Sequence, residues 1–473
     1  MSTLTPAIID GMEVLGAEVT EVRSPYDGHV VGSVPALSAT HIDDAVAVAL
    51  DRHRGGPLPS HRRAEILDRA AELLATRLEE FGRSISEESA KPITTATVEA
   101  GRAVDTLRFS AAVARSASGE VIPLDASAVG VGKLGFVKRV PVGVIGAISP
   151  FNFPLNLVCH KVAPAIAAGC PVVLKPASAT PLTALRIAAL FEEAGLPPGW
   201  LNVVTCPGSV ANHLVEHDDV AMITFTGSPE VGWGIRAAAP RKRVSLELGN
   251  NAPVIIEPDA DLDAVAAKVA VAGYSFAGQS CISVQRVLVH ASVHDELRDL
   301  LAERVAALVV GDPADPATNV SALISERETR RVKSWIDEAA GAGARVIAGG
   351  EIRTDGVLCP TLVDGVEPDM QLSRTEVFGP LVGLASYTDV EDAFRAANDT
   401  RYGLQAGIFT SKLATALRAA EVLDFGGVTV NEVPTWRADH MPYGGIRDSG
   451  NTREGPAYTV EEMTERRLVV MQP

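Results

Sequence analysis

The sequence lacks the features that would assign it to a membrane, a secreted or a metal-binding class. No apolar run approaches the ~20 residues that a transmembrane helix needs, and residues 1–7 contain no basic segment leading into an apolar one. The five cysteines are scattered and form no Cys-x-x-Cys pair, which argues against a disulfide framework and a metal site. We therefore expect a cytoplasmic protein with no metal, no signal peptide and no membrane partner.

Composition favours a globular enzyme with more than one domain. A chain of 473 residues is too long for one ordinary core, so we expect two or three domains. Hydrophobic residues make up 47% and charged residues 21%, a balance that excludes disordered and fibrous classes. The formal net charge of −17 repels phosphate backbones, so nucleic acid is not an expected partner. One local arginine would still permit a small anionic substrate.

The pattern along the chain predicts an α/β protein. After a short strand and turn, the first 120 or so residues look helical, and apolar residues recur at helical spacing through 61–82. From Val140 short apolar runs alternate with helices, and the alternation restarts after Gly249, which predicts two lobes with parallel sheets and a hinge near 247–249. We expect strands at 142–149, 172–175, 201–205, 221–225, 253–257, 286–290 and 426–431, and helices at 154–168, 181–194 and 262–276.

Two segments fit neither lobe. Residues 131–142 and 463–471 both have the pattern of extended chain. An extended terminal strand leaves backbone groups unpaired unless a partner covers them, and that partner is often a neighbouring subunit. We therefore expect a homo-oligomer, either a dimer or a tetramer.

Two glycine patterns differ in their context. Gly-Val-Gly-Lys-Leu-Gly at 130–135 matches the dinucleotide fingerprint literally, but a β-like run ending in Pro141 follows it where a helix is needed. We interpret it as a loop and a strand. Gly227 and Gly232 instead follow an expected strand and open a helix, whose N-terminus attracts a pyrophosphate. The second pattern is the better candidate for a nucleotide site.

Three side chains could make and then hydrolyse a thioester. Cys281 has small polar neighbours that suit an exposed, hydrated thiol, whereas Cys159 and Cys170 belong to an apolar helix and its end, where inert cysteine is expected. Glu247 ends a strand between two leucines, where desolvation favours a general base. Asn152 is either a turn residue or an oxyanion donor. Since Glu247 and Cys281 fall in different lobes, we expect the chemistry in the cleft between them.

Seven motifs in family order make the chain resemble the NAD(P)-dependent aldehyde dehydrogenases over nearly its whole length. They are PFNFPL at 150–155, VLKPA at 173–177, FTGS at 225–228, LELG at 246–249, GQSC at 278–281, EVFGP at 376–380 and PYGG at 442–445. The resemblance implies two doubly wound parallel-sheet lobes plus a small β oligomerisation arm. The implied boundaries are 1–122 and 142–248 for the dinucleotide-binding domain, 249–455 for the catalytic domain, and 123–141 and 456–473 for the arm.

The resemblance also implies roles for individual residues. Cys281 attacks the aldehyde, Asn152 and the Cys281 backbone N–H hold the oxyanion, and Glu247 activates the water that hydrolyses the thioester. The implied cofactor is NAD or NADP, held by Ile148, Ser149, Pro150, Phe151, Lys175, Ser178, Gly227, Ser228, Gly232, Leu248, Glu376 and Phe378. Two alternatives are a CoA-acylating semialdehyde dehydrogenase, which does not need Glu247, and a non-catalytic binding protein on the same fold.

Ser178 bears on the choice between NAD and NADP. Strict NAD users of the family commonly have a glutamate there, and its charge repels a 2′-phosphate. Serine removes that repulsion, so we predict that NADP is accepted. Asn250 and Thr452 depart from the commoner family pattern, which leaves the loop geometry around them open.

The substrate is expected to be a small, polar or anionic aldehyde. Residues 428–445 are similar to the lactaldehyde and phosphonoacetaldehyde dehydrogenase branch, and 151–157 to non-phosphorylating glyceraldehyde-3-phosphate dehydrogenases. Arg102 falls near a phosphate-binding arginine of the last group, although a solvated helix residue is the plainer interpretation. Ser280 replaces their second arginine, which argues against a phosphorylated substrate. The candidate substrate residues are Arg102, Phe153, Ser280, Ile282, Trp436 and His440, with Arg437 also near the mouth.

Overall fold

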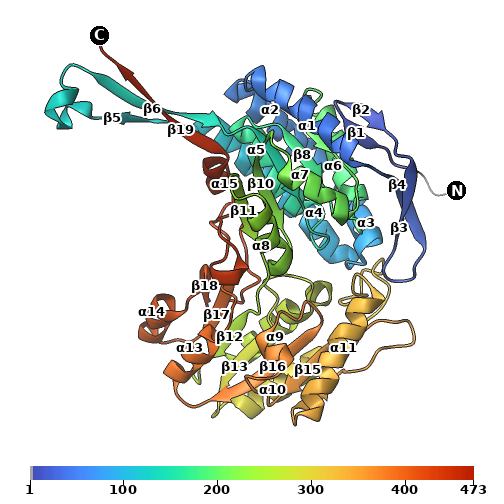
Figure 1. The fold of residues 1–473 in the computed structure, drawn as a ribbon. Helices are drawn as coiled ribbons and strands as arrows, with labels where there is room; N and C mark the ends of the chain where they lie inside the picture. The colour runs from blue at the N-terminus through green and yellow to red at the C-terminus, as the bar shows by residue number, and fades with distance from the viewer. Residues whose placement is uncertain (1–3) are drawn as a thin grey trace.

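Two α/β lobes and a projecting β arm make up residues 4–473, the part of the chain that the computed structural model describes (Figure 1). The sheet of the first lobe has the strand order β11-β10-β7-β8-β9-β1-β2, in which β7 to β11 are parallel and β1 and β2 are antiparallel. Its strands are β1 Ala7–Ile9, β2 Met12–Val14, β7 Val144–Ile148, β8 Val172–Lys175, β9 Leu201–Val203, β10 Val220–Thr226 and β11 Arg243–Glu247, and β3 Glu18–Arg23 and β4 Val30–Ala36 form a separate hairpin.

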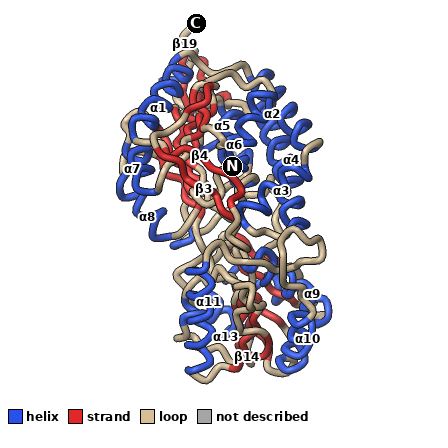
Figure 2. Tube along the Cα trace, turned by 90° about the vertical axis from the view of Figure 1, so that its right-hand side faces the viewer, coloured by secondary structure: helices blue, strands red, loops and turns tan. Residues whose placement is uncertain are grey.

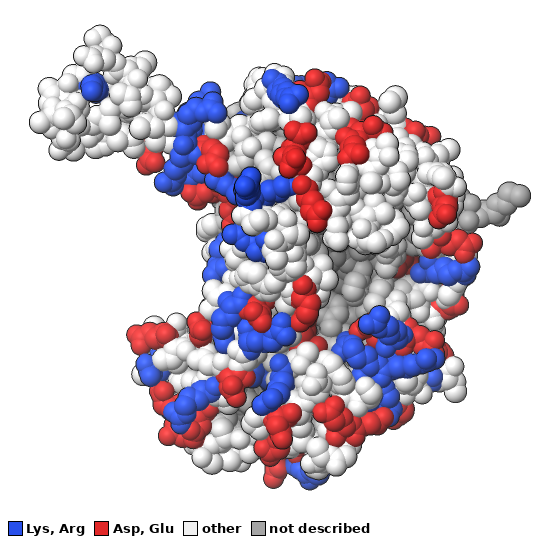
Figure 3. All heavy atoms as spheres, viewed as in Figure 1, with Lys and Arg blue, Asp and Glu red and all other residues white. Residues whose placement is uncertain are grey.

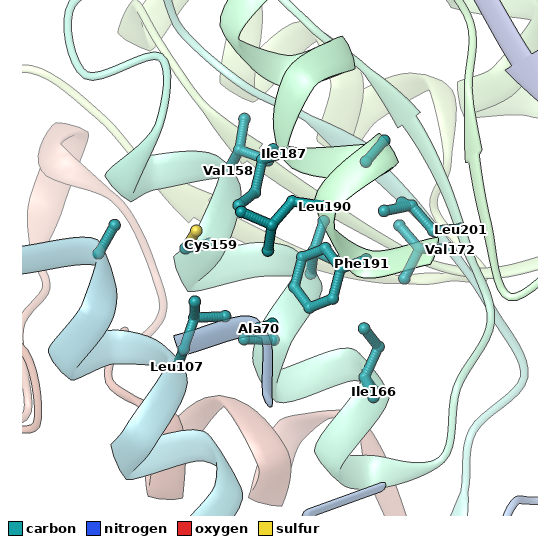
Figure 4. Close-up of a cluster of buried hydrophobic side chains, with 14 of the residues drawn as sticks. Ala70, Leu107, Val158, Cys159, Ile166, Val172, Ile187, Leu190, Phe191 and Leu201 are labelled. Carbon is teal, nitrogen blue, oxygen red and sulfur yellow. The ribbon is translucent and has the colours of Figure 1, made fainter. Parts of the chain in front are cut away.

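Helices cover both faces of this first sheet (Figure 2). They are α1 Ala39–Arg54, α2 Ser60–Ala75, α3 Leu78–Ser89, α4 Ile93–Ser116, α5 Asn156–Ala168, α6 Leu182–Glu193, α7 Gly208–Glu216 and α8 Pro229–Ala238. Helices α1, α7 and α8 pack on one face, and α2, α4, α5 and α6 on the other. In Figure 4, Phe191 of α6 packs among apolar side chains from both helices and strands. Cys159 belongs to the same cluster, as predicted, and fully burying one side chain of the size of Phe191 contributes ~1.5–3 kcal/mol.

The second lobe repeats the α/β arrangement. Its sheet has the order β14-β15-β16-β13-β12-β17-β18, parallel except for the edge strand β14. Its strands are β12 Pro253–Ile256, β13 Arg286–His290, β14 Arg345–Ala348, β15 Thr361–Asp364, β16 Leu381–Tyr387, β17 Gln405–Phe409 and β18 Gly427–Val430. Its helices are α9 Leu262–Tyr274, α10 His294–Ala306, α11 Glu326–Gly341, α12 Gln371–Arg374, α13 Val390–Asn398 and α14 Leu413–Val422, with short 3-10 turns η3 Ser275–Gly278 and η4 Arg447–Ser449.

The arm is a three-stranded antiparallel sheet. It consists of β5 Glu120–Ile122, β6 Leu134–Pro141 and β19 Thr464–Met471, with the turns η1 Leu124–Ala126 and η2 Ala128–Gly130 at its tip. Helix α15 Pro456–Glu462 leads into β19 and packs on α5. The terminal strand β19 has a partner, β6, in the same chain on one edge, and its other edge pairs with no strand of residues 4–473. Assembly with a neighbouring subunit therefore stays a prediction. The glycine-rich stretch 130–135 is the turn and the start of β6, as predicted.

The predicted strands and helices are present, with ends within two residues of the expected positions. The helical pattern at 61–82 is confirmed and falls on two helices, because the chain turns between α2 and α3 at Thr76, whose hydroxyl donates to the carbonyl of Leu73 at 2.8 Å. The domain boundaries stay a prediction, and residues 1–3 of the first range lie outside the described residues. Within 4–473, no helix is long and apolar enough to cross a membrane.

Candidate active site

A cavity of about 540 Å³ between the lobes brings the three candidate catalytic residues together. Glu247 is the last residue of β11, and Asn152 lies in the loop that follows β7. Cys281 comes from the second lobe, in the loop between η3 and β13. All three residues line the cavity. The carboxyl ends of two strands of one sheet, β7 and β11 on either side of β10, thus face a loop of the other lobe, which is where ligands of open α/β sheets bind.

The loop that carries Cys281 has an unusual backbone. Helix α9 ends at Tyr274, and Phe276 and Ala277 then adopt left-handed conformations with φ of 50° and 52°. Such conformations cost ~1–3 kcal/mol for residues with a Cβ, and they persist only where the surroundings impose them. Gly278 follows at φ 70°, and a Cβ there would lie 2.1 Å from the carbonyl oxygen of Gly379. The loop that carries Cys281 is therefore closely packed against the segment around Gly379.

The Cys281 thiol is half-buried, which corrects the expectation of an exposed, hydrated thiol. Its sulfur lies 2.9 Å from the Tyr443 hydroxyl and packs beside Ile282 and Leu404. Burial raises the pKa of the Cys281 thiol to about 12. The small polar residues next to Cys281 in the sequence do not determine the exposure of its thiol, because side chains distant in sequence cover the sulfur.

Asn152 is held by a buried ion pair. Its side-chain Nδ2 donates to the carbonyl of Gln279 at 3.0 Å, two residues before the cysteine, and its own carbonyl accepts from Lys91 Nζ at 2.6 Å. Lys91 also pairs with Glu99, and Glu99 accepts two backbone N–H groups at the start of α5 at 3.0 and 3.1 Å. The pair therefore fixes the Asn152 loop to the start of α5, with the amide pointing at the nucleophile loop.

The Glu247 carboxylate is buried and lacks a hydrogen-bond partner at either oxygen among residues 4–473. Burial raises the pKa of Glu247 well above its ordinary value, and the negative charge of Glu454 adds to the increase. A buried carboxyl group with free acceptor atoms facing a cavity is suited to exchange a proton with water.

A network of buried charges lies beside Tyr443, and none of its members lines the cavity. We call this network, which comprises Arg102, His160, Lys161, Arg437, Asp439 and Glu454, the charged cluster. Glu454 accepts from Arg437 at 2.8 Å, and Lys161 Nζ lies 3.8 Å from its other oxygen. Asp439 accepts from Arg102 at 2.8 and 3.1 Å and lies 2.9 Å from His160. These pairs keep both carboxylates charged although they are buried.

The two carboxylates of the charged cluster differ from Glu247 in their pKa. Burial works to raise the pKa of Glu454, but His160, Arg437 and Lys161 outweigh it and lower that pKa to about 2. Burial also opposes ionisation of Asp439, and the hydrogen bonds and charges of His160 and Arg102 overcome it and lower its pKa. Of these three carboxyl groups, Glu247 is therefore the one that is readily protonated, and Glu454 and Asp439 stay ionised.

Eleven of the twelve candidate cofactor residues line the cavity, and Gly232 does not. Those that line it are Ile148, Ser149, Pro150, Phe151, Lys175, Ser178, Gly227, Ser228, Leu248, Glu376 and Phe378. A Cβ on Gly232 would lie 2.4 Å from Leu248 Cδ2, so this glycine lets α8 pack closely beneath the cavity.

The chemistry of the cavity wall fits a dinucleotide. Helix α8 begins at Pro229, next to Gly227 and Ser228, and its N-terminus faces the cavity, as a pyrophosphate site requires. Lys175 is buried, and no ion pair within 4–473 includes it, so its ammonium is free for hydroxyl or phosphate oxygens. Burial raises the pKa of Glu376 to about 8. The rings of Phe151 and Phe378 meet edge to face at 5.8 Å.

The six candidate substrate residues lie outside the cavity wall and occupy different surroundings. Arg102, on α4, is bonded to buried Asp439 and is not a solvated helix residue. Phe153 lies under the Lys91 ammonium at 3.8 Å, and Ile282 is buried beside Tyr443. Ser280 lines a small separate cavity. Trp436 and His440 are exposed, and the His440 ring lies 4.5 Å from the ring of Phe109.

Comparison with known proteins decides the family. The model of the aldehyde dehydrogenase family matches residues 14–469. This chain belongs to the aldehyde dehydrogenase family. It is 43% identical to a 3-sulfolactaldehyde dehydrogenase of Priestia megaterium over the full length of both chains. It is 36% identical to a lactaldehyde dehydrogenase of Methanococcus aeolicus over 95% of this chain and 97% of the relative.

A solved structure of the same family supports the fold. The NADP-dependent glyceraldehyde-3-phosphate dehydrogenase of Bacillus halodurans, solved with NADP, matches with a TM-score of 0.96 at 35% identity, over 100% of this chain and 99% of that one. The predicted fold and the predicted enzyme class, an NAD(P)-dependent aldehyde dehydrogenase, are confirmed.

Sequence analysis did not identify several residues of this aldehyde dehydrogenase site. Lys161, Glu454 and Tyr443 lie within or beside the charged cluster, and Lys91 supports the Asn152 loop. Arg331 lines the cofactor cavity and was also missed. One signal was available, because Lys161 follows His160 within α5, a helix that is otherwise mostly apolar and is buried at all of its residues. Adjacent ionisable residues in a buried helix need partners, which indicates a polar network.

Proposed function

We propose that this aldehyde dehydrogenase oxidises a small, polar or anionic aldehyde to its carboxylate through a thioester on Cys281. The observation that carries the proposal is the shared cavity, in which Cys281 from one lobe meets Glu247 and Asn152 from the other. A nucleophile, an amide donor and an unpaired carboxyl group are the three parts that acyl formation and hydrolysis need.

Thioester formation begins with Cys281. Its sulfur forms a bond to the aldehyde carbon, and the carbonyl oxygen takes the electron pair and becomes an oxyanion. Asn152 Nδ2 and the backbone N–H of Cys281 donate to that oxygen, and the Lys91–Glu99 pair supports the proposal because it fixes the Asn152 loop. A bound nicotinamide dinucleotide supplies the acceptor for the hydride that leaves the carbon. The oxyanion then collapses to the thioester carbonyl.

Hydrolysis depends on Glu247. Its carboxylate takes a proton from a water molecule, the resulting hydroxide attacks the thioester carbon, and the C–S bond breaks to release the Cys281 thiolate and the carboxylic acid, which gives its proton to solvent water and leaves as the carboxylate. The raised pKa of Glu247, caused by burial and by Glu454, supports this role because it makes the carboxylate a stronger base.

The cavity residues support use of both NAD and NADP. Lys175 and Glu376 would hold ribose hydroxyls, the start of α8 would hold the pyrophosphate, and Ser178 would lie beside the adenosine ribose. Ser178 is exposed, and the carboxyl groups in the cavity wall are Glu247 and Glu376, both placed at the reaction end by our assignment. Nothing in the wall near Ser178 therefore repels a 2′-phosphate.

The charged cluster supports an anionic aldehyde. It contains three cationic side chains, Arg102, Lys161 and Arg437, against the carboxylates of Asp439 and Glu454, and His160 lies beside Asp439. A neutral or weakly positive region beyond the nucleophile would attract a negatively charged substituent. The activities for which the relatives are named, on 3-sulfolactaldehyde and lactaldehyde, agree with a short hydroxylated or sulfonated aldehyde.

A panel of aldehydes tests the proposal. We would follow reduction of NAD and NADP with lactaldehyde, sulfolactaldehyde, succinic semialdehyde, phosphonoacetaldehyde and glyceraldehyde-3-phosphate. We expect reduction that is lost in Cys281→Ala and retained in Cys359→Ala, since Cys359 lies outside the cavity. Free acid as the product supports hydrolysis by Glu247, whereas an acyl-CoA formed only with added CoA would favour the acylating alternative.

The arm supports assembly into a homo-oligomer. Its tip carries few charges in Figure 3 and exposes Val121, Val129 and Val131, which are 70–80% accessible. Arginine and lysine side chains gather where it joins the first lobe, around a cavity of about 800 Å³. Exposed apolar groups on a projecting sheet favour contact with another copy. Light scattering would measure the mass of the full chain, and a monomer would contradict the assembly.

A further inference from the structure

We propose that Tyr443 is a further catalytic residue, whose hydroxyl donates a hydrogen bond to the sulfur of Cys281 and stabilises the thiolate that attacks the aldehyde. The inference rests on the proposed function, because it takes Cys281 as the nucleophile. Its basis is geometric. The hydroxyl lies 2.9 Å from the sulfur, although the two residues are 162 positions apart and come from different loops.

The hydrogen bond counteracts the effect of burial on the pKa of Cys281. Burial raises the pKa of Cys281, and the charges of Glu376 and Glu247 raise it further. A half-buried thiol of this kind is rarely ionised at neutral pH. The two other groups facing the sulfur are the Tyr443 hydroxyl and the Arg437 guanidinium, and both lower the pKa. Tyr443 is the one of these that contacts the sulfur directly.

Tyr443 is suited to be the donor. Burial raises the pKa of its phenol well above the ordinary value, so the hydroxyl keeps its proton over the working pH range. A thiolate has no proton to donate and can only accept. In the ionised state the bond therefore runs from the Tyr443 O–H to the Cys281 sulfur. The thiol proton leaves to water in the cavity, and Tyr443 does not exchange its own.

The ring of Tyr443 is fixed from two directions. Its backbone forms a two-bond bridge with Glu454, with N···O distances of 2.9 and 2.5 Å. The Arg437 guanidinium lies over the ring at 3.8 Å from its centroid and is itself held by Glu454 at 2.8 Å. A cation on the ring face attracts the π electrons, which strengthens the O–H as a donor. Arg437 is thus a positioning residue that acts through Tyr443.

The hydrogen bond from Tyr443 to the Cys281 sulfur weakens as the reaction proceeds. When the sulfur bonds to the aldehyde carbon, its negative charge moves to the carbonyl oxygen, and a neutral sulfur is a weak acceptor. Stabilising a thiolate raises its population tenfold for each pKa unit but lowers its intrinsic reactivity about threefold, since thiolate nucleophilicity follows basicity with a slope of ~0.4–0.5. The net gain at neutral pH is about threefold for each unit.

The test compares Tyr443→Phe with its parent in a Cys359→Ser background. Phenylalanine keeps the ring, the packing and the contact with Arg437 and removes only the hydroxyl. Cys359 is the other half-buried thiol, and the remaining three cysteines are buried, so iodoacetamide in this background reports on Cys281. Tyr458→Phe, at a partly exposed tyrosine of α15, is the matched control.

We expect Tyr443→Phe to move the alkylation pH midpoint up by about one unit and to lower the alkylation rate about threefold at lower pH. The value of kcat/KM for the aldehyde should fall by a similar factor, while Tyr458→Phe should match the parent. An unchanged or lowered midpoint would overturn the hydrogen bond, and a raised midpoint with unchanged kcat/KM would overturn its catalytic role. Alkylation needs no turnover, so it decides the bond even if the proposed function fails.

Discussion

The two sides of Cys281 are built differently. On one side lies an open cavity of about 540 Å³ with an apolar wall, the start of α8 and two separate ionisable side chains, Lys175 and Glu376. On the other side the members of the charged cluster bond to one another. The contrast indicates a division of work. The open side has room for a large cofactor, and the packed side sets protonation states and the charge offered to the substrate.

Removing the base at the boundary of the two sides should have the largest effect. Glu247→Gln keeps the shape of the side chain but cannot take a proton from water. General-base catalysis contributes about 10²–10⁴-fold, so we expect steady-state turnover to fall by that factor while the first round of cofactor reduction persists. Rapid-mixing absorbance measurements distinguish the first round of cofactor reduction from steady-state turnover. Glu193→Gln, at an exposed glutamate paired with Arg77, is the control, and turnover within tenfold of the parent would rule out this role.

A charge added on the open side should change cofactor choice. With Ser178→Glu, a carboxylate would face the 2′-phosphate, and like charges in contact cost several kcal/mol. We expect kcat/KM for NADP to fall about a hundredfold while that for NAD changes little. Ser178→Gln adds the same bulk without the charge and should leave NADP use intact. If the two variants lose NADP activity equally, bulk and not charge is responsible. A parent enzyme about a thousandfold less efficient with NADP than with NAD would contradict NADP use outright.

A charge removed from the packed side should change substrate choice. Arg102→Ala deletes one cation and leaves Asp439 without its two-bond partner. We expect kcat/KM for an anionic aldehyde to fall about tenfold relative to a neutral aldehyde of similar size. Arg108→Ala, on the same helix but exposed, is the control. An unchanged ratio of the two substrates would remove Arg102 from substrate selection.

The smallest expected effect is a shift in the pH profile. Glu454 raises the pKa of Glu247, and the base must be ionised to act, so activity rises with pH through that pKa. Glu454→Gln removes the repelling charge and makes ionisation easier. We expect the acid limb of a hydrolysis-limited profile to move to lower pH by about one unit. Glu454→Asp keeps the charge and should shift it less. Movement to higher pH would show that Glu454 does not act through its charge.

The two sides also differ in how far the sequence predicts them. The open side is assembled from the ends of consecutive strands, so β-α alternation and short motifs such as those at 225–228 and 376–380 identify it. Gly232 was assigned to the wall because the spacing suits a phosphate site, whereas steric fit against Leu248 explains it. The local sequence pattern therefore predicts most residues of the cavity wall, and Gly232 is the one cofactor candidate that it misplaces.

The packed side is assembled from α4, α5 and two segments near the C-terminus, with partners 17 to 337 positions apart. No local motif encodes the pairing of Arg102 with Asp439 or of Tyr443 with Cys281, because such contacts depend on how the lobes meet. The expected hydrated thiol was wrong for the same reason. Long-range burial decides the state of an ionisable group, and the residues next to it in sequence do not reveal that burial.

The most direct test of the account is the mass of the acyl enzyme. Glu247→Gln, mixed with a substrate aldehyde and NAD or NADP, should accumulate the thioester, because the sulfur can still be acylated but water is no longer activated. Intact-protein and peptide mass spectrometry should then find the acyl group of the aldehyde on Cys281. Absence of the adduct in an enzyme that still reduces the cofactor, or an acyl group on another residue, would contradict the mechanism.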